Sequence, residues 1–138
     1  MDSGEVLHYS KSNRVVYLGR HSVARVICGD SVDSAQKIVN TLKVSNGAVI
    51  EGGDHLNPTP VAVSDASLFQ TNTDYIKTFT LNTPVFNNVA STTVPVVTYT
   101  TTLISARVLM VINEAGMFFG TDGPMFAHYS FPTMALIS

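Results

Sequence analysis

The residues that could carry out chemistry in this chain are few and widely spaced. The four histidines do not form a His-x-x-x-His pair at any point; they are His8, His21, His55 and His128. Asp54 and His55 are neighbours in a glycine-rich segment, but a metal site needs about three or four ligands that converge on one point. We therefore interpret them as a solvated loop pair, and we predict that the protein binds neither a metal ion nor a cofactor.

The candidate nucleophiles and acid–base groups have simpler structural interpretations. Cys28 has no neighbouring residue to activate it, so we expect a buried structural thiol. Ser22 and His21 are adjacent in an expected strand and would point to opposite faces. Glu114 and Asp122 could pair to bind Ca²⁺ or to exchange protons, but Glu114 can also accept backbone N–H groups at a turn while Asp122 forms the bend. We predict that the protein is not an enzyme.

The stretch that contains both carboxylates, residues 111–132, predicts a β-hairpin. Two apolar runs at 117–119 and 125–127 flank the sequence Gly120-Thr121-Asp122-Gly123-Pro124. Glycine and aspartate favour a turn, and the proline prevents the chain from continuing as a helix. Both faces of the second arm, 125–131, carry an aromatic ring, so neither face is expected to be simply open to water. We expect the hairpin to pack on its own core on one side and on something else on the other.

The apolar residues of this hairpin form a candidate interface with a partner. Aromatic residues and methionine are enriched in the cores of protein interfaces, where Lys, Glu and Asp are depleted. The alternative is that some of these side chains are ordinary core residues. The candidate interface consists of Met117, Phe118, Phe119, Met125, Phe126 and His128. For the last of these we expect a strand histidine that is hydrogen-bonded at a sheet rim or interface.

The hairpin resembles the "EAGLF…DG…LFAR…FP" signature of small β-rich virion proteins of tailed bacteriophages. The residues that match are Asn113-Glu114-Ala115-Gly116-Met117-Phe118, Asp122-Gly123, Met125-Phe126-Ala127 and Phe131-Pro132. An upstream segment resembles the "GTG…P…SDTAL" segment of the same family through Gly52-Gly53-Asp54, Pro58, Pro60 and Ser64-Asp65-Ala66-Ser67-Leu68. The chain departs from the family pattern at His128, where Arg is commoner, and at Ser138, where many relatives continue through a Trp-containing strand.

The resemblance implies a structural protein of the virion. Proteins of this kind occur as capsid cement or decoration subunits and as parts of tail fibres. We expect a cement protein on the capsid surface, made in the host cytoplasm, whose partners are the major capsid protein and a second copy of itself, most simply as a homodimer. One alternative is a tail-fibre or baseplate component. Another, from a different class, is a carbohydrate-binding module that uses exposed aromatic residues and the segment 52–73.

Composition limits the other possible functions. The 138 residues are enough for one domain with its own core. A net charge of −2 with scattered basic residues argues against nucleic-acid binding, which needs a clustered basic patch. The sequence has no apolar run of about 20 residues to span a membrane and no recognisable signal peptide. Charged residues make up only 13% of the chain, which suggests that another chain covers part of its surface.

The pattern of strands and turns predicts a mainly β fold, an antiparallel β-sandwich or jelly roll with one short helix. We expect residues 1–13 to be an N-terminal arm or edge strand and residues 14–138 to be a single β-sandwich domain. Helical spacing of apolar residues predicts the helix at about 32–43, and the polar, proline-containing segment 52–73 predicts a long loop with a helical turn near 65–68. The expected strands are 6–9, 15–18, 23–28, 48–50, 75–81, 94–104, 107–112, 117–119 and 125–131.

Overall fold

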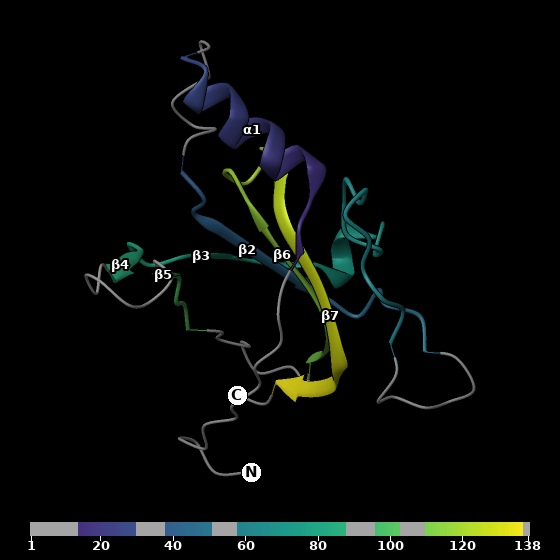
Figure 1. Ribbon diagram of the computed structural model, residues 1–138. Coiled ribbons are helices and arrows are strands. Elements are labelled where there is room, and N and C mark those ends of the chain that lie inside the picture. The colour runs from purple at the N-terminus through teal and green to yellow at the C-terminus, as the bar shows by residue number, and fades with distance from the viewer. Residues whose placement is uncertain (1–13, 30–37, 51–57, 88–95, 103–109, 137–138) are drawn as a thin grey trace.

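The computed structural model describes residues 14–29, 38–50, 58–87, 96–102 and 110–136 (Figure 1). Five antiparallel strands form the main sheet in the order β1-β7-β6-β2-β3, and two further strands, β4 and β5, form a separate ribbon. The strands are Arg14–Val15 (β1), Thr41–Ser45 (β2), Lys77–Thr80 (β3), Val85–Asn87 (β4), Val96–Thr98 (β5), Met110–Phe118 (β6) and Met125–Leu136 (β7). The helical elements are α1, Tyr17–Ile27, and a short 3₁₀ helix, η3, Thr73–Tyr75.

The prediction of a mainly β fold is confirmed, whereas the finer architecture is not. Within the described ranges the strands form one open sheet and one ribbon, and they do not form a closed barrel or a sandwich. The expected arm or edge strand at 1–13 lies outside the described residues. Neither helix of the described part is long and apolar enough to cross a lipid bilayer.

The β6–β7 hairpin confirms the central prediction and is longer than predicted. The amide of Phe119 donates to the carbonyl of Pro124 at 3.0 Å, which closes the loop at the end of the strands. Gly120 has φ of 89°, a value that glycine tolerates without strain. Pro132 lies inside β7 beside an irregularity in the register, between the pairs Ile112–Met134 and Glu114–Ser130. A proline is tolerated there because the ladder of hydrogen bonds is already interrupted.

The predicted strands at 15–18 and 23–28 are wrong, because most of these residues form α1. Two small residues, Gly19 and Ser22, are the buried positions of this helix. They allow α1 to approach β7 closely: a Cβ atom on Gly19 would lie 2.4 Å from the carbonyl oxygen of Phe126. The β-branched residues of the segment favour a strand when considered alone, and the contact with β7 overrides that preference.

The predicted helix at 32–43 is also wrong over the part that can be compared. Residues 30–37 lie outside the described ranges, and Thr41 begins strand β2 instead. Strand β2 pairs with β3 on one side and β6 on the other, and it is at least half-buried along its whole length. A strand covered on both faces lacks the alternation of polar and apolar residues that identifies an exposed strand, so its apolar residues also fit a helical period.

The remaining predictions are confirmed in part. The strand at 75–81 is observed as β3, part of 94–104 as β5, and residues 110–112 of 107–112 belong to β6. Residues 48–50 form no strand, since Ile50 makes only an isolated bridge to Pro58. The long loop is confirmed over 58–72, but its helical turn is η3 rather than a turn at 65–68. The strand expected at 6–9 lies outside the described residues.

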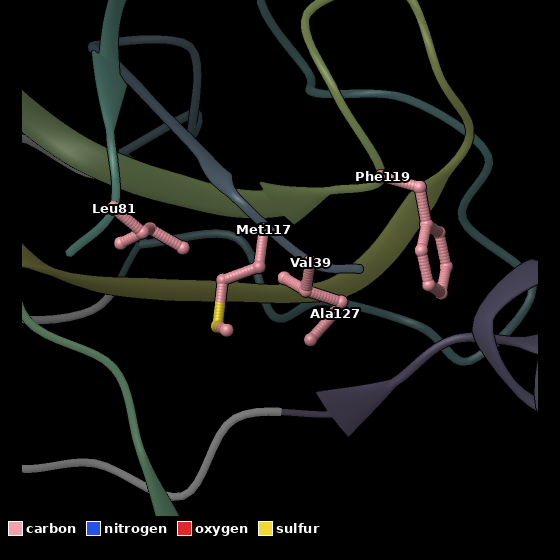
Figure 2. Packing of buried hydrophobic residues seen from close by; sticks show 5 residues of the cluster. All are labelled: Val39, Leu81, Met117, Phe119 and Ala127. Atoms are coloured by element: carbon pink, nitrogen blue, oxygen red, sulfur yellow. The ribbon is translucent and has the colours of Figure 1, made fainter. Parts of the chain in front are cut away.

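Both faces of the main sheet are covered. Met117 and Phe118 are consecutive in β6, so their side chains point to opposite faces. On one face Met117 belongs to the cluster shown in Figure 2: Val39, Leu81, Met117, Phe119 and Ala127. On the other face Phe118 packs with Val16, Leu68 and Met125. Leu68 comes from the 61–70 loop, so this loop covers the second face in place of a second sheet.

The close contact between α1 and β7 predicts an unusual response to substitution of Gly19. At an exposed position inside a helix, a Gly→Ala change stabilises the protein by about 1 kcal/mol. Here we expect Gly19→Ala to destabilise by about 1–3 kcal/mol, because the new methyl group meets the backbone of Phe126. Urea denaturation measures the change. The control is Ala24→Gly on the exposed side of α1, which should destabilise by about 1 kcal/mol. Stabilisation by Gly19→Ala would contradict the close packing.

Candidate functional site

Two ionisable side chains lie completely buried in the middle of the main sheet. Glu114 in β6 and His128 in β7 both have 0% exposed surface. The register of the hairpin places them diagonally on adjacent strands, since Glu114 is opposite Ser130 and Gly116 is opposite His128. The Nε2 atom of His128 lies 2.8 Å from Oε1 of Glu114. Such a pair is stable inside a protein only when its remaining polar atoms also have partners.

The second ring nitrogen of His128 contacts another carboxylate, which comes from the 61–70 loop. Nδ1 lies 2.9 Å from Oδ2 of Asp65, whose side chain is 18% exposed. The ring centroid of Phe69 is 4.8 Å from that of His128. The ring thus contacts one carboxylate at each of its two nitrogens. We refer to Asp65, His128 and Glu114 as the Asp–His–Glu cluster.

Glu114 accepts hydrogen bonds from three other groups besides His128. The hydroxyl of Ser45 in β2 donates to Oε2 and the amide of Phe69 donates to Oε1. The amide of Gln70 donates to Oε2 at 3.3 Å. Burial alone raises the pKa of Glu114, but the hydrogen bonds from His128, Ser45 and Phe69 and the charge of His128 outweigh it, so the pKa lies below its ordinary value. Glu114 therefore remains an ionised acceptor at neutral pH.

The Asp–His–Glu cluster fastens the 61–70 loop to the sheet. Asp65 accepts a hydrogen bond from the amide of Ala62 at 2.8 Å, which closes a turn in the loop around the same carboxylate that contacts His128. Gly116 leaves room for the loop, since a Cβ atom there would lie 3.0 Å from Cδ2 of Leu68. A long segment without regular structure is thus held in place by ionic and backbone contacts at one point.

The geometry of the cluster limits the chemistry it can perform. The two carboxylates lie at opposite nitrogens of the ring, so the three side chains cannot converge on one metal ion. Within the described residues no group of three or more His, Cys, Asp or Glu side chains could hold a metal. Ser45 donates to Glu114 and is not placed against the imidazole as a nucleophile would be. The contacts are those of a buried structural ion cluster.

Most residues of the predicted interface lie in the interior of this chain. The structure supports the core interpretation for the apolar residues in both clusters, while Phe126 is half-buried and packs edge-on against Phe119 at 5.5 Å. His128 is hydrogen-bonded as predicted, but it is buried rather than at a rim. The side chains buried in this way are Met117, Phe118, Phe119, Met125 and His128. Contact of the predicted set with a partner stays a prediction.

Other sequence-based interpretations have mixed outcomes. Glu114 accepts backbone N–H groups as predicted, although the donors come from the 61–70 loop rather than from a local turn. Asp122 lies exposed in the hairpin turn. The expectation of a buried Cys28 is wrong, because its thiol is exposed after the end of α1. His21 is exposed and Ser22 donates to the Leu18 carbonyl, so they do not form a pair, although the reason is a helix rather than a strand.

Sequence reasoning missed Asp65 as a partner of His128. Two ionisable residues, Glu114 and His128, stand among apolar residues on the arms of a predicted hairpin. Counting outward from the turn would have placed them on adjacent strands and the same face. Asp65 could not be found in this way, because the loop has no periodic pattern that fixes its position. Asp54, His55 and His8 lie outside the described residues.

We predict that Glu114→Gln destabilises the protein by about 3–5 kcal/mol at pH 7, because it breaks a buried ion pair and leaves His128 without one partner. The pKa of Glu114 is lowered in the folded state, so its contribution is complete above the ordinary glutamate pKa and is lost as the pH falls through the folded pKa. Urea denaturation at a series of pH values should therefore show that the difference in unfolding free energy between the unaltered protein and the Glu114→Gln variant narrows below about pH 4.5. A difference in unfolding free energy that did not change with pH would contradict the view that Glu114 is ionised in the folded protein.

We predict that Asp65→Asn loosens the 61–70 loop while the sheet stays folded, because it weakens the contact between the loop and His128. Amide hydrogen exchange should become faster by at least about ten-fold in the loop, which corresponds to a loss of about 1.4 kcal/mol, and should change little in β6 and β7. The matched control is Asp74→Asn, since Asp74 is an exposed aspartate in η3. Equal effects of both changes would show that the contact with His128 does not hold the loop.

Comparisons of this chain with models of protein families, with curated proteins and with solved structures find no match. The role of the Asp–His–Glu cluster follows from its own contacts. It neutralises a buried carboxylate, and it joins β2, β6, β7 and the 61–70 loop at one point.

Proposed function

We propose that this chain is a non-enzymatic structural protein of a tailed-phage virion, and that it binds the assembled capsid shell as a cement subunit. Its partners are the major capsid protein and a second copy of itself. The subunit adds buried apolar area and backbone hydrogen bonds across the boundaries between shell subunits. This raises the free energy needed to separate those subunits.

The observation that carries the proposal is the convergence of the two segments that resemble the virion-protein signature. Asp65 and Leu68 come from the upstream segment, whereas Glu114, Phe118 and His128 come from the hairpin. Asp65 and Glu114 both contact His128, and Leu68 packs with Phe118 in one core cluster. Residues that resemble a signature and also meet in space support the view that the signature describes a shared architecture.

The departure at His128 fits the same architecture. Arginine, which is commoner at this position in the family, is a cation that can donate to two carboxylates at once. The imidazole of His128 also contacts two carboxylates, through ring nitrogens that lie 2.8 Å from Glu114 and 2.9 Å from Asp65. The substitution therefore keeps a nitrogen-containing side chain that contacts both acidic residues. This supports the resemblance at the position where the sequence departs from it most.

The surface of the described part suits a protein that is covered by others in an assembly. Large apolar side chains are exposed on α1 and on the β4–β5 ribbon, including Ile27 at 79%, Val85 at 66% and Phe86 at 58%. Exposed apolar patches mark surfaces that contact other proteins. A shell offers many equivalent sites, so weak contacts that are made together are sufficient.

The tail-fibre or baseplate alternative draws on the same resemblance and differs only in location. The carbohydrate-binding alternative needs exposed aromatic rings for stacking on sugars. The chain contains no tryptophan, and in the described part the exposed aromatic residues Tyr17, Tyr75 and Phe86 lie on three separate elements. A sugar site requires several groups that converge, so the cement proposal is favoured.

We predict that the purified chain sediments with capsid shells of its phage that were assembled without it. Binding should saturate at a fixed ratio to the shell subunits, and the bound shells should withstand a higher temperature before they dissociate, because the free energy of binding adds to their stability. Density-gradient sedimentation followed by quantitative gel analysis measures both results. Purified tail proteins and a sugar array serve as parallel probes. Binding to either of these without binding to shells would contradict the cement function.

A further inference from the structure

The β4–β5 ribbon is separate from the main sheet of the described fold. Its two strands pair antiparallel, with Phe86 opposite Val97 and Val85 opposite Thr98, and no third described strand joins them. A two-stranded ribbon alone is marginally stable in water, and it normally needs a third strand or a packed face. Figure 1 shows the ribbon beyond the end of β3 and away from α1.

The base of the ribbon, in contrast, is well anchored to the main sheet. The amide of Asn82 donates to the carbonyl of Thr100 at 2.8 Å, and the hydroxyl of Thr101 donates to the carbonyl of Thr80 at 2.8 Å. Tyr99 packs against the core cluster that contains Leu81. The ribbon therefore extends from a fixed base rather than from a loose linker, so it can present its side chains in a defined position.

The side chains it presents are apolar and exposed. Residues directly opposite each other in an antiparallel pair point to the same face. Phe86 and Val97 therefore share one face, where they are 58% and 47% exposed. Val85, on the other face, is 66% exposed. A soluble protein that kept this ribbon uncovered would expose aliphatic and aromatic surface on both of its sides.

The ribbon also belongs to a stretch without acidic or basic side chains. No Asp, Glu, Lys, Arg or His occurs between Lys77 and Arg107. A partner therefore gains no binding free energy from ion pairs at this surface. A partner with a charged surface would lose the hydration of its charges without compensation. The best complement is another uncharged apolar surface. A second copy of the ribbon is such a surface, and it meets the first without repulsion between like charges.

The exposed face of α1 is the competing candidate for self-association, and its charge disfavours that role. The exposed Arg20 lies on this helix, and the helix contains no acidic residue. Two copies packed through α1 would bring their Arg20 side chains together. The ribbon has no such conflict.

We propose that the β4–β5 ribbon is the surface through which two copies of this chain associate. Phe86 and Val97 of one copy pack on the same residues of the other in an isologous contact, the arrangement that gives a closed dimer. The contact covers the apolar face that the single chain leaves open. This inference locates the self-association that the proposed function includes, and it can fail independently of shell binding.

The test is the oligomeric state of the full chain in solution, measured by sedimentation velocity over a range of concentrations. We expect the unaltered chain to form dimers. Phe86→Lys and Val97→Lys should each raise the dimer Kd by at least about ten-fold, because they place a charge in an apolar contact. The matched control is Ile27→Lys on α1, which changes an apolar residue that is 79% exposed and should leave the Kd unchanged. Circular dichroism and urea midpoints confirm that each variant is folded.

A mixture of the Phe86→Lys and Phe86→Glu variants provides a second test of the dimer contact. Each variant alone should be monomeric, and the mixture should dimerise because opposite charges then meet at the contact. The inference is overturned if the unaltered chain is monomeric throughout, if both ribbon variants dimerise as it does, or if only Ile27→Lys disrupts the dimer. Shell sedimentation keeps the two proposals apart. A chain that binds shells as a monomer contradicts this inference alone, and a dimer that does not bind shells contradicts the cement function alone.

Discussion

The fold depends on the compensation of one buried negative charge. Transfer of a carboxylate from water to a protein interior costs several kcal/mol unless hydrogen bonds and an opposite charge offset the loss of hydration. Glu114 meets this requirement with donors from three places: Ser45 in β2, His128 in β7 and the amides of Phe69 and Gln70 in the loop. These donors belong to three different segments, so the three segments must be in place together before the charge is compensated.

The same requirement specifies the register of the sheet. A slip of one residue between β6 and β7 would move either Glu114 or His128 to the opposite face. It would also separate the imidazole from Asp65 and place Gly116 away from Leu68. Apolar residues alone tolerate such shifts, because Met117 and Phe118 offer similar surface to both faces. The buried charges therefore select one arrangement, which is the best-attested use of a costly buried ion pair.

The parts of the fold that could be predicted from the sequence are those that local chemistry determines. The β6–β7 hairpin was predictable because the turn residues from Gly120 to Pro124 restrict the backbone wherever the arms go. Helix α1 was not predictable, since its segment favours a strand until Gly19 packs on β7, which lies far away along the chain. The acceptor role of Glu114 could be predicted, but its partner Asp65 could not, because a loop carries no period that fixes its place.

The few charged residues of this chain are divided unevenly between its interior and its surface. The chain has few charged residues, and two of them, Glu114 and Asp65, contact a histidine in the interior of the fold instead of solubilising the exterior. The exterior in turn includes a ribbon with no charge at all, which favours association. The residues that stabilise the fold are thus distinct from those that remain exposed. In the proposed dimer, a change at Phe86 would alter association without disturbing the cluster at His128, so folding and assembly would be separable by mutation.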